Sequence, residues 1–229
     1  MKKIWNFGGS KTDFGQKISN GFDKLQFGRD SVDYSDVDGF IKKIENNSTK
    51  YFIPDVIVFN MNPNTHYFNF GQKITPYGDF EKLINLIKTN FFFQVRLTEW
   101  FFSNHKNKRI LFLTSHQSNS IIQNTDDLNS EIFDDGDLLL YRMSRALEHQ
   151  LIHAQNVRKS NHINNNIIMG VCVGHNIPNT AKYLNGIIKK DSFKRNVYSI
   201  GNESFERGSS STIQMIFQEN IFPILSDLT

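Results

Sequence analysis

Tyr141 and Arg145 lie four residues apart in a segment, residues 140–159, whose apolar residues recur at helical spacing. Side chains at that spacing share one face of a helix, so the Arg145 guanidinium would lie beside the Tyr141 phenol. A neighbouring cation lowers the pKa of a tyrosine, whose ordinary value of about 10 is too high for proton transfer near neutral pH. At this spacing a cation could hold the pKa of the phenol down, and an ordinary helix pair is the alternative interpretation.

A glycine-rich stretch follows the first apolar run of the chain. Residues 7–16 read Phe-Gly-Gly-Ser-Lys-Thr-Asp-Phe-Gly-Gln, so Gly9 and Gly15 are six residues apart. Between a strand and a helix, such glycines let the backbone approach a diphosphate, and the first helix amides attract its charge. The stretch predicts a nucleotide site, with a plain turn as the alternative.

Short strand-like runs alternate with longer segments of helical spacing along the chain. Alternation of this kind is typical of a parallel sheet with helices on both faces, so we expect an α/β fold, a three-layer doubly wound sheet of the Rossmann type. The expected strands are residues 3–7, 24–28, 54–60, 109–115, 167–173 and 196–201. The expected helices are residues 15–22, 37–46, 80–102 and 140–159, with a closing helix or an interface segment at 213–225.

Length and composition limit the classes of protein to which the chain can belong. A chain of 229 residues fits one domain, residues 1–229, and its net charge of +3 is spread too evenly to indicate nucleic-acid binding. The single cysteine, Cys172, excludes an internal disulfide and favours a reducing compartment. Because no apolar run resembles a secretion signal or a membrane span, we expect a cytoplasmic protein without membrane contact.

Polar residues come at the ends of two expected central strands. Asn60 and Asn62 follow one strand, and Thr114, Ser115 and His116 follow the other. Open parallel sheets bind ligands outside the carboxyl ends of their strands. We therefore expect the functional site at this edge of the sheet.

Taken in order, these features resemble the short-chain dehydrogenase/reductase family from Lys3 to about Thr180. The first turn of that family reads Thr-Gly-x-x-x-Gly-x-Gly; here Gly9 and Gly15 keep the outer glycines, and Asp13 replaces the middle one. The resemblance implies a nicotinamide dinucleotide lying against this turn. Its contacts there would be Gly9, Ser10, Lys11, Asp13, Phe14 and Gly15.

The resemblance also implies contacts at the ends of the later strands. Arg29 stands just past a glycine, where members that prefer NADP often carry an arginine, and a guanidinium can bind a 2′-phosphate through two charge-assisted hydrogen bonds. With Lys11, this favours NADP over NAD, although Arg29 could also be an ordinary loop residue. The remaining contacts would be Tyr34, Asn60, Met61 and Gly174.

Asp33 resembles the first acid of the Asp-x-x-Asp segment that follows the third strand of the family. That acid contacts the adenine amino group in family members. A cap on the helix that begins near Val37 is the alternative role for this aspartate.

For catalysis, the resemblance implies that Tyr141 protonates a carbonyl oxygen and that Ser115 polarises it. Asn90 would kink the long helix and hold a proton-relay water. Arg145 replaces the lysine of the family; it keeps a positive charge that can bind the ribose, but it cannot release a proton.

The expected function is therefore NADP-dependent reduction of a carbonyl or imine in a small molecule. A catalytically impaired nucleotide-binding or regulatory protein is the alternative, favoured by Asp13, Arg145 and the altered Asn60 segment together. A third possibility is an oligomerising scaffold with an empty pocket.

Aromatic residues crowd the expected helix at residues 80–102. Phe91, Phe92 and Phe93 are consecutive, and a Trp-Phe-Phe run ends the segment. Such a run is typical of core packing and subunit contact. We expect this helix to contribute to the core and to a homodimer or homotetramer interface.

Two further features invite a chemical interpretation that we set aside. His149 and His153 have the spacing of two metal ligands, but no other ligand pattern accompanies them, so we expect a solvated helix face and no metal. Cys172 lies between two valines and is expected in the core.

The polar segments 61–79 and 117–137 could form the walls of a substrate pocket, and a disordered insertion is the alternative for the second segment.

Overall fold

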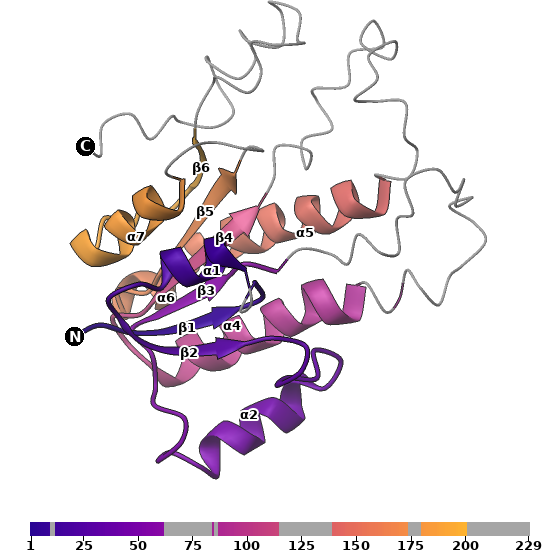
Figure 1. Ribbon diagram of the computed structural model, residues 1–229. Helices are drawn as coiled ribbons and strands as arrows, with labels where there is room; N and C mark the ends of the chain where they lie inside the picture. Colours follow the sequence, from indigo (N-terminus) through magenta and orange to yellow (C-terminus); the bar gives the residue numbers. More distant parts are fainter. Residues whose placement is uncertain (10–11, 62–83, 85–86, 115–138, 174–179, 201–229) are drawn as a thin grey trace, which may run out of the picture.

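The computed structural model of the chain describes residues 1–9, 12–61, 84, 87–114, 139–173 and 180–200. Within these residues, six parallel strands form one sheet in the order β2-β1-β3-β4-β5-β6 (Figure 1). Their bounds are β1 Lys3–Phe7, β2 Asp23–Phe27, β3 Val56–Phe59, β4 Arg109–Thr114, β5 Ile167–Val173 and β6 Val197–Ile200.

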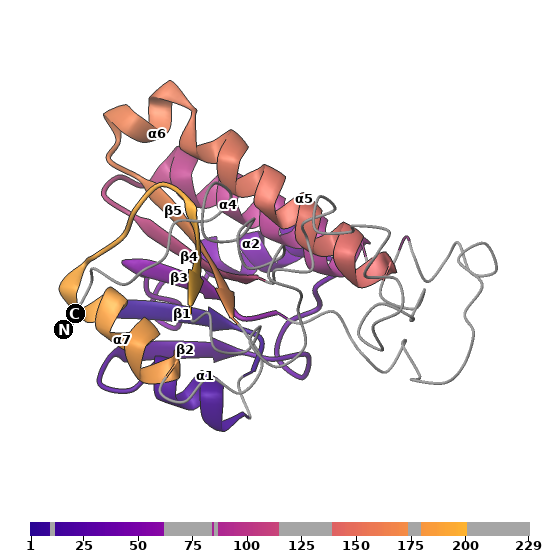
Figure 2. The same cartoon turned by 90° about the horizontal axis from the view of Figure 1, so that it is seen from above.

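Helices lie on both sides of this sheet, which confirms the doubly wound α/β fold (Figure 2). α1 and α7 cover one face, and α2, α4 and α5 cover the other. The helices are α1 Asp13–Ile18, α2 Val37–Glu45, a π-helical segment Ile87–Phe92, α4 Phe93–Asn104, α5 Leu139–Asn156, α6 Lys159–Ile163 and α7 Thr180–Lys190.

The strands are apolar because both of their faces are covered. In β3, Val56 and Val58 pack toward α1 and α7, whereas Ile57 and Phe59 pack toward the opposite layer. The period of two that sends successive side chains to opposite faces therefore produces a continuous apolar run in this strand.

The direction of winding changes between β1 and β3. The chain passes from β1 outward to β2, and then returns through α2 to the other side of β1. The helices of these two connections lie on opposite faces of the sheet. In open α/β sheets such a change of face marks the ligand-binding crevice, which here would lie at the carboxyl ends of β1 and β3. This crevice positions the candidate site.

The last crossover has the opposite hand to the others. The steps β3 to β4, β4 to β5 and β5 to β6 all run in one direction across the sheet, yet α7 lies on the face opposite to α4 and α5, beside α1. Since about 98% of such connections are right-handed, the β5–α7–β6 connection is unusual. Its effect is to place α7 over Val58, Leu111 and Met169, which α4 and α5 leave uncovered.

Between Phe27 and Val56 the chain forms α2 and no strand. Asp33 lies in the loop after β2, so the strand that precedes the Asp-x-x-Asp segment in the family has no counterpart here. Apolar residues of this segment, Phe40 and Tyr51 among them, pack on the aromatic layer beneath β1. They cover the sheet instead of extending it.

Most predicted elements are confirmed within a few residues. Two helices, α6 and α7, were not predicted, and the described part of the expected helix at 80–102 is a π-helical segment followed by α4. The predicted closing helix at 213–225 lies outside the described residues. Among the helices that the structure describes, none has the length and apolar character needed to cross a membrane.

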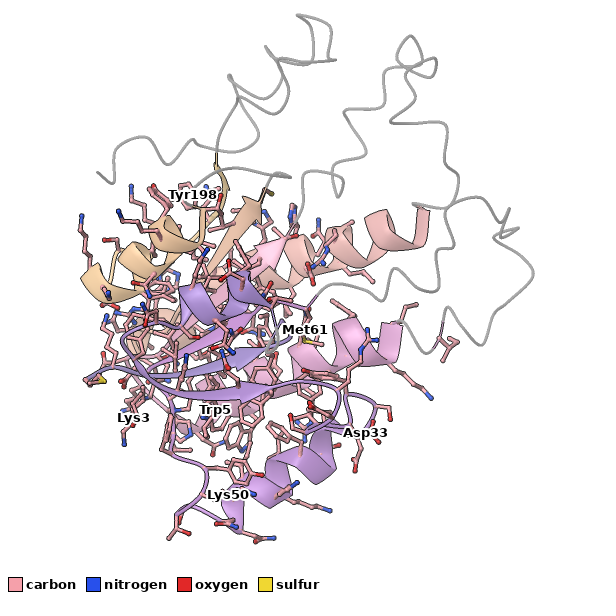
Figure 3. All side chains as sticks on the ribbon, in the orientation of Figure 1. Lys3, Trp5, Asp33, Lys50, Met61 and Tyr198 are labelled. Atoms are coloured by element: carbon pink, nitrogen blue, oxygen red, sulfur yellow. The ribbon has the colours of Figure 1, made fainter. Side chains whose placement is uncertain are left out.

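An aromatic layer fills the space between β1 and α4. The rings of Trp5 and Trp100 stack with centroids 6.4 Å apart, and Phe7 lies 5.5 Å from Phe93. Trp5 is labelled within this layer in Figure 3. Phe93 is fully buried, whereas Phe92 is 56% exposed, so the phenylalanine run divides between core and surface.

We expect the neighbouring substitutions Phe93→Ala and Phe92→Ala to differ sharply in stability. Loss of the Phe93 ring removes buried contacts and leaves a cavity, which lowers the free energy of unfolding by about 3–5 kcal/mol. Loss of the exposed Phe92 ring changes it by less than about 0.5 kcal/mol. Urea unfolding of both variants measures the difference, and equal losses would contradict the assignment of Phe93 to the core.

Candidate functional site

The glycine turn lies at the carboxyl end of β1, as the sequence predicts. Gly8 and Gly9 have φ angles of 79° and 60°, in the left-handed region that favours glycine. A Cβ atom on Gly15 would lie 2.2 Å from the main-chain oxygen of Gly9. Gly8 and Gly9 are therefore required by their φ angles. Gly15 is required because the start of α1 is in main-chain contact with the glycine turn.

Thr12 caps α1 and links it to the turn, a role that we did not predict. Its hydroxyl donates to the Gly9 carbonyl at 2.8 Å and accepts from the Gly15 amide at 3.1 Å. A threonine immediately before a helix is a usual N-cap, so the sequence did contain this signal. Asn6, fully buried on β1, donates to the Gly15 carbonyl at 3.1 Å and holds the other side of the helix start.

Asn60 joins the turn from the end of β3. The main-chain amide of Asn60 donates to the Phe7 carbonyl at 2.8 Å. A Cβ atom on Gly9 would lie 2.3 Å from the side-chain nitrogen of Asn60. The structure thus brings together Gly9, Gly15 and Asn60, three of the predicted cofactor contacts. They meet at the crevice between β1 and β3.

Asp13 projects from the exposed side of α1. Its carboxylate pairs with Lys17 at 2.5 Å, one helical turn away, and both side chains are largely solvent-exposed. The negative charge that replaces the middle glycine is therefore matched locally. Phe14 packs partly against the apolar layer of α1 and α7, and the predicted contacts Ser10 and Lys11 lie outside the described residues.

Asp33 and Asp36 have different roles in the loop before α2. Asp33 accepts from the Ser35 amide at 2.9 Å and from the Ser35 hydroxyl at 2.6 Å, and these bonds lower the pKa of its carboxyl. Asp36 is the residue that caps α2, by accepting from the Gly39 amide at 2.9 Å. The alternative in which Asp33 caps this helix is wrong by three residues.

Tyr34 lies beneath the turn, whereas Arg29 is exposed. The Tyr34 hydroxyl donates to the Phe27 carbonyl at 2.9 Å, and burial raises the pKa of this phenol to about 12. The Phe27 carbonyl also accepts from the Gly8 amide, so Tyr34 supports the turn from below. Arg29 stands in solvent two residues past the end of β2, where an anionic group could reach it. Figure 3 shows Asp33 in the same loop and Met61 beyond the end of β3.

Arg145 is almost fully buried between α5 and the sheet. Its guanidinium donates to the main-chain oxygens of Met61 at 2.9 Å and of Leu113 at 3.3 Å. It also pairs with both carboxylate oxygens of Glu148, at 2.7 and 2.8 Å. The cation that was expected to serve Tyr141 is therefore accompanied by a similarly buried anion, Glu148, which no pattern in the sequence indicated.

A second polar group lies one turn further along α5. His149 is 8% exposed, and its Nε2 atom lies 3.0 Å from the Thr114 hydroxyl and 3.9 Å from the Cys172 sulfur. The expectation of a solvated His149 is wrong, although His153 is exposed. Cys172 is buried as predicted, and burial raises the pKa of its thiol. Within the described ranges, no three side chains of His, Cys, Asp or Glu gather as metal ligands would.

The remaining predicted catalytic residues are described only in part. Asn90 lies in the π-helical segment, and such a widened turn is a known cause of helix kinks. Tyr141 lies in α5, one turn before Arg145. Ser115 and Gly174 lie outside the described residues, as does most of the segment 61–79 and all of 117–137.

The fold is that of the short-chain dehydrogenase/reductases. A short-chain dehydrogenase from Bacillus anthracis superposes with a TM-score of 0.60 at 10% identity, covering 89% of this chain and 96% of that one. An NADH-dependent reductase complexed with NAD gives 0.61 at 11% identity, with 89% and 96% covered. A Serratia marcescens short-chain dehydrogenase/reductase variant gives 0.57 at 13% identity, with 89% and 97% covered. In sequence, no family model and no curated protein matches the chain.

The contact between turn and helix predicts opposite effects for two glycine-to-alanine substitutions. Gly15→Ala places a methyl group against main-chain atoms, which overpacks the turn and lowers the free energy of unfolding by about 1–3 kcal/mol. In Gly186→Ala, on α7, the added methyl group meets no atom within 4 Å. This variant raises the free energy of unfolding by about 0.5–1 kcal/mol, because alanine favours a helix more than glycine does. Thermal unfolding of the two variants provides the comparison; a stabilised Gly15→Ala variant would rule out the close approach.

Proposed function

We propose that the chain is a divergent short-chain dehydrogenase/reductase, an oxidoreductase that uses a nicotinamide dinucleotide, with NADP preferred over NAD. Its substrate would be the carbonyl or imine group of a small molecule. The bound cofactor would supply hydride from nicotinamide C4, and the protein would bind, orient and protonate. The observation that carries the proposal is the glycine turn at the point where the winding of the sheet reverses.

The described residues of the turn fit a dinucleotide. Gly8 and Gly9 remove side chains where a diphosphate would approach, and α1 begins directly behind them with Thr12 as its cap. Asp13 is paired with Lys17 in solvent, so its charge is partly offset there. Asn60 flanks the same turn from β3.

The preference for NADP is supported by Arg29. Its guanidinium is exposed beyond β2, at the side of the turn where the adenosine end of a dinucleotide would lie. Planar guanidinium groups bind phosphate through paired hydrogen bonds. Asp33, in the same loop, is proposed as the adenine contact. Both hydrogen bonds from Ser35 reach its Oδ1 atom, so Oδ2 is proposed as the acceptor for adenine.

Tyr141 is proposed as the general acid and Ser115 as the donor that polarises the substrate carbonyl. Asn90 is proposed to hold the relay water from the π-helical segment. We also propose one domain over residues 1–229, and a homodimer or homotetramer through the helix that carries Phe91 and Phe92. Phe92 supports that interface because it is a large exposed apolar side chain.

The second candidate function, a nucleotide-binding protein with impaired turnover, is favoured by the Arg145–Glu148 pair. A cation lowers the pKa of a neighbouring phenol only to the extent that its charge is not matched by an anion. Both oxygens of Glu148 lie within 2.8 Å of the Arg145 guanidinium, so the positive charge of Arg145 is matched by a counter-ion. Binding without reduction would identify this candidate.

Arg29→Ala tests cofactor choice. Because hydrogen bonds to a charged group contribute about 1.5–3 kcal/mol, the variant should bind NADPH at least about tenfold more weakly while NADH affinity stays unchanged. Lys43→Ala, which removes a cation from the last turn of α2, serves as the control. Fluorescence titration with each nucleotide gives the four affinities, and equal losses for NADPH and NADH would refute the 2′-phosphate contact.

Tyr141→Phe tests the general acid. With a panel of aldehydes and ketones, loss of absorbance at the nicotinamide band should slow by about 10²–10⁴-fold, while NADPH affinity is retained. Tyr183→Phe, on α7, is the control and should keep wild-type turnover. A Tyr141→Phe variant that turns over normally would sink the catalytic assignment, whereas a wild-type protein that binds NADPH but reduces no substrate would favour the second candidate.

A further inference from the structure

Arg145 connects two neighbouring strands at the functional edge of the sheet. Met61 follows β3 and Leu113 is near the end of β4, and the main-chain oxygens of both residues accept from the same guanidinium. These two strands are paired along their length, from Val56 opposite Arg109 to Phe59 opposite Phe112. Beyond that point the Arg145 side chain bridges them.

Glu148 and Gln94 complete a buried network around this bridge. The Glu148 carboxylate accepts twice from Arg145, and one of its oxygens also accepts from the Gln94 side chain at 3.0 Å. The three residues are 1%, 2% and 1% exposed, in the order Arg145, Glu148 and Gln94. The network therefore joins α4, α5 and the ends of β3 and β4 in a region shielded from water.

The chemistry of the network requires these residue types. A buried guanidinium without a counter-ion is strongly unfavourable, so Glu148 is needed for Arg145 to remain charged there. The planar guanidinium presents several donors in fixed directions and can serve two carbonyls and a carboxylate together. A lysine ammonium is a compact charge on a flexible stem and cannot reproduce that span.

We propose that Arg145 and Glu148 form a clamp that sets the spacing between the carboxyl ends of β3 and β4, with Glu148 as a positioning residue for the β3 side of the crevice. Arg145 acts in this account through the main chain of Met61 and Leu113 and not as a ligand of the nucleotide. The inference rests on the proposed function only in taking this crevice as the nucleotide site.

Hydrogen exchange of the nucleotide-free protein tests the clamp directly. In the double variant Arg145→Met/Glu148→Leu, exchange in the segments 56–61 and 109–114 should rise at least tenfold, whereas segments 3–7 and 167–173 stay as in the wild type. Apolar replacement of both partners avoids an unpaired buried charge, which favours a folded variant. Arg158→Met breaks the more exposed pair with Glu99 and is the matched control, expected to leave β3 and β4 unchanged.

Arg145→Lys provides a second variant that keeps the charge beside Glu148. The clamp predicts the same local rise in exchange, because the ammonium cannot reach both carbonyls. Wild-type exchange in Arg145→Lys would show that charge alone suffices and would overturn the clamp. Unchanged exchange in the double variant, or an equal rise in all strands, would overturn it as well.

NADPH titration separates this inference from the proposed function. If both hold, the double variant binds NADPH at least tenfold more weakly than the wild type, and Arg158→Met binds it normally. Weaker NADPH binding without any change in exchange would make Arg145 a direct ligand and refute the clamp. If the wild type binds no NADPH, the proposed function fails, and the exchange measurements decide the clamp by themselves.

Discussion

Close main-chain approach at the carboxyl ends of β1 and β3 is the constraint on which the rest of the candidate site depends. Gly8 and Gly9 turn the chain through the left-handed region, and Gly15 lets α1 begin against the turn. The side chains of Thr12 and Asn6 then form hydrogen bonds with main-chain groups of Gly9 and Gly15 at this contact. The helix start can lie at the crevice because no side chain separates it from the turn.

A second constraint is the buried ion pair of Arg145 and Glu148 at the carboxyl ends of β3 and β4. α5 presents an arginine to the sheet where the resemblance implies a lysine, and the larger group is accommodated by a carboxylate one turn away and an amide from α4. Glu148 and Gln94 thus belong with Arg145, since a buried cation without them would be unstable. The arginine that stands where the resemblance implies a lysine therefore depends on two further side chains, those of Glu148 and Gln94.

The sequence was informative where local pattern and tertiary environment agree. β3 and β4 were recognisable because strands covered on both faces are apolar throughout. The glycine turn was recognisable because its backbone geometry excludes other residues. The packing partners of Phe40 and Tyr51 were not predicted, because the sequence does not show which layer an apolar residue joins. In the structure both residues belong to the aromatic layer beneath β1.

From sequence alone, the alternation of elements, their approximate bounds, the glycine turn and the apolar faces of the helices were determined, because each follows from periodicity or from the conformational limits of single residues. The tertiary structure alone decided which polar side chains are buried. Arg145 and Met61 are 84 residues apart, and Gln94 and Glu148 are 54 apart. A polar group is stable in the interior only when its partner arrives with it, and that meeting depends on how the helices pack across the sheet.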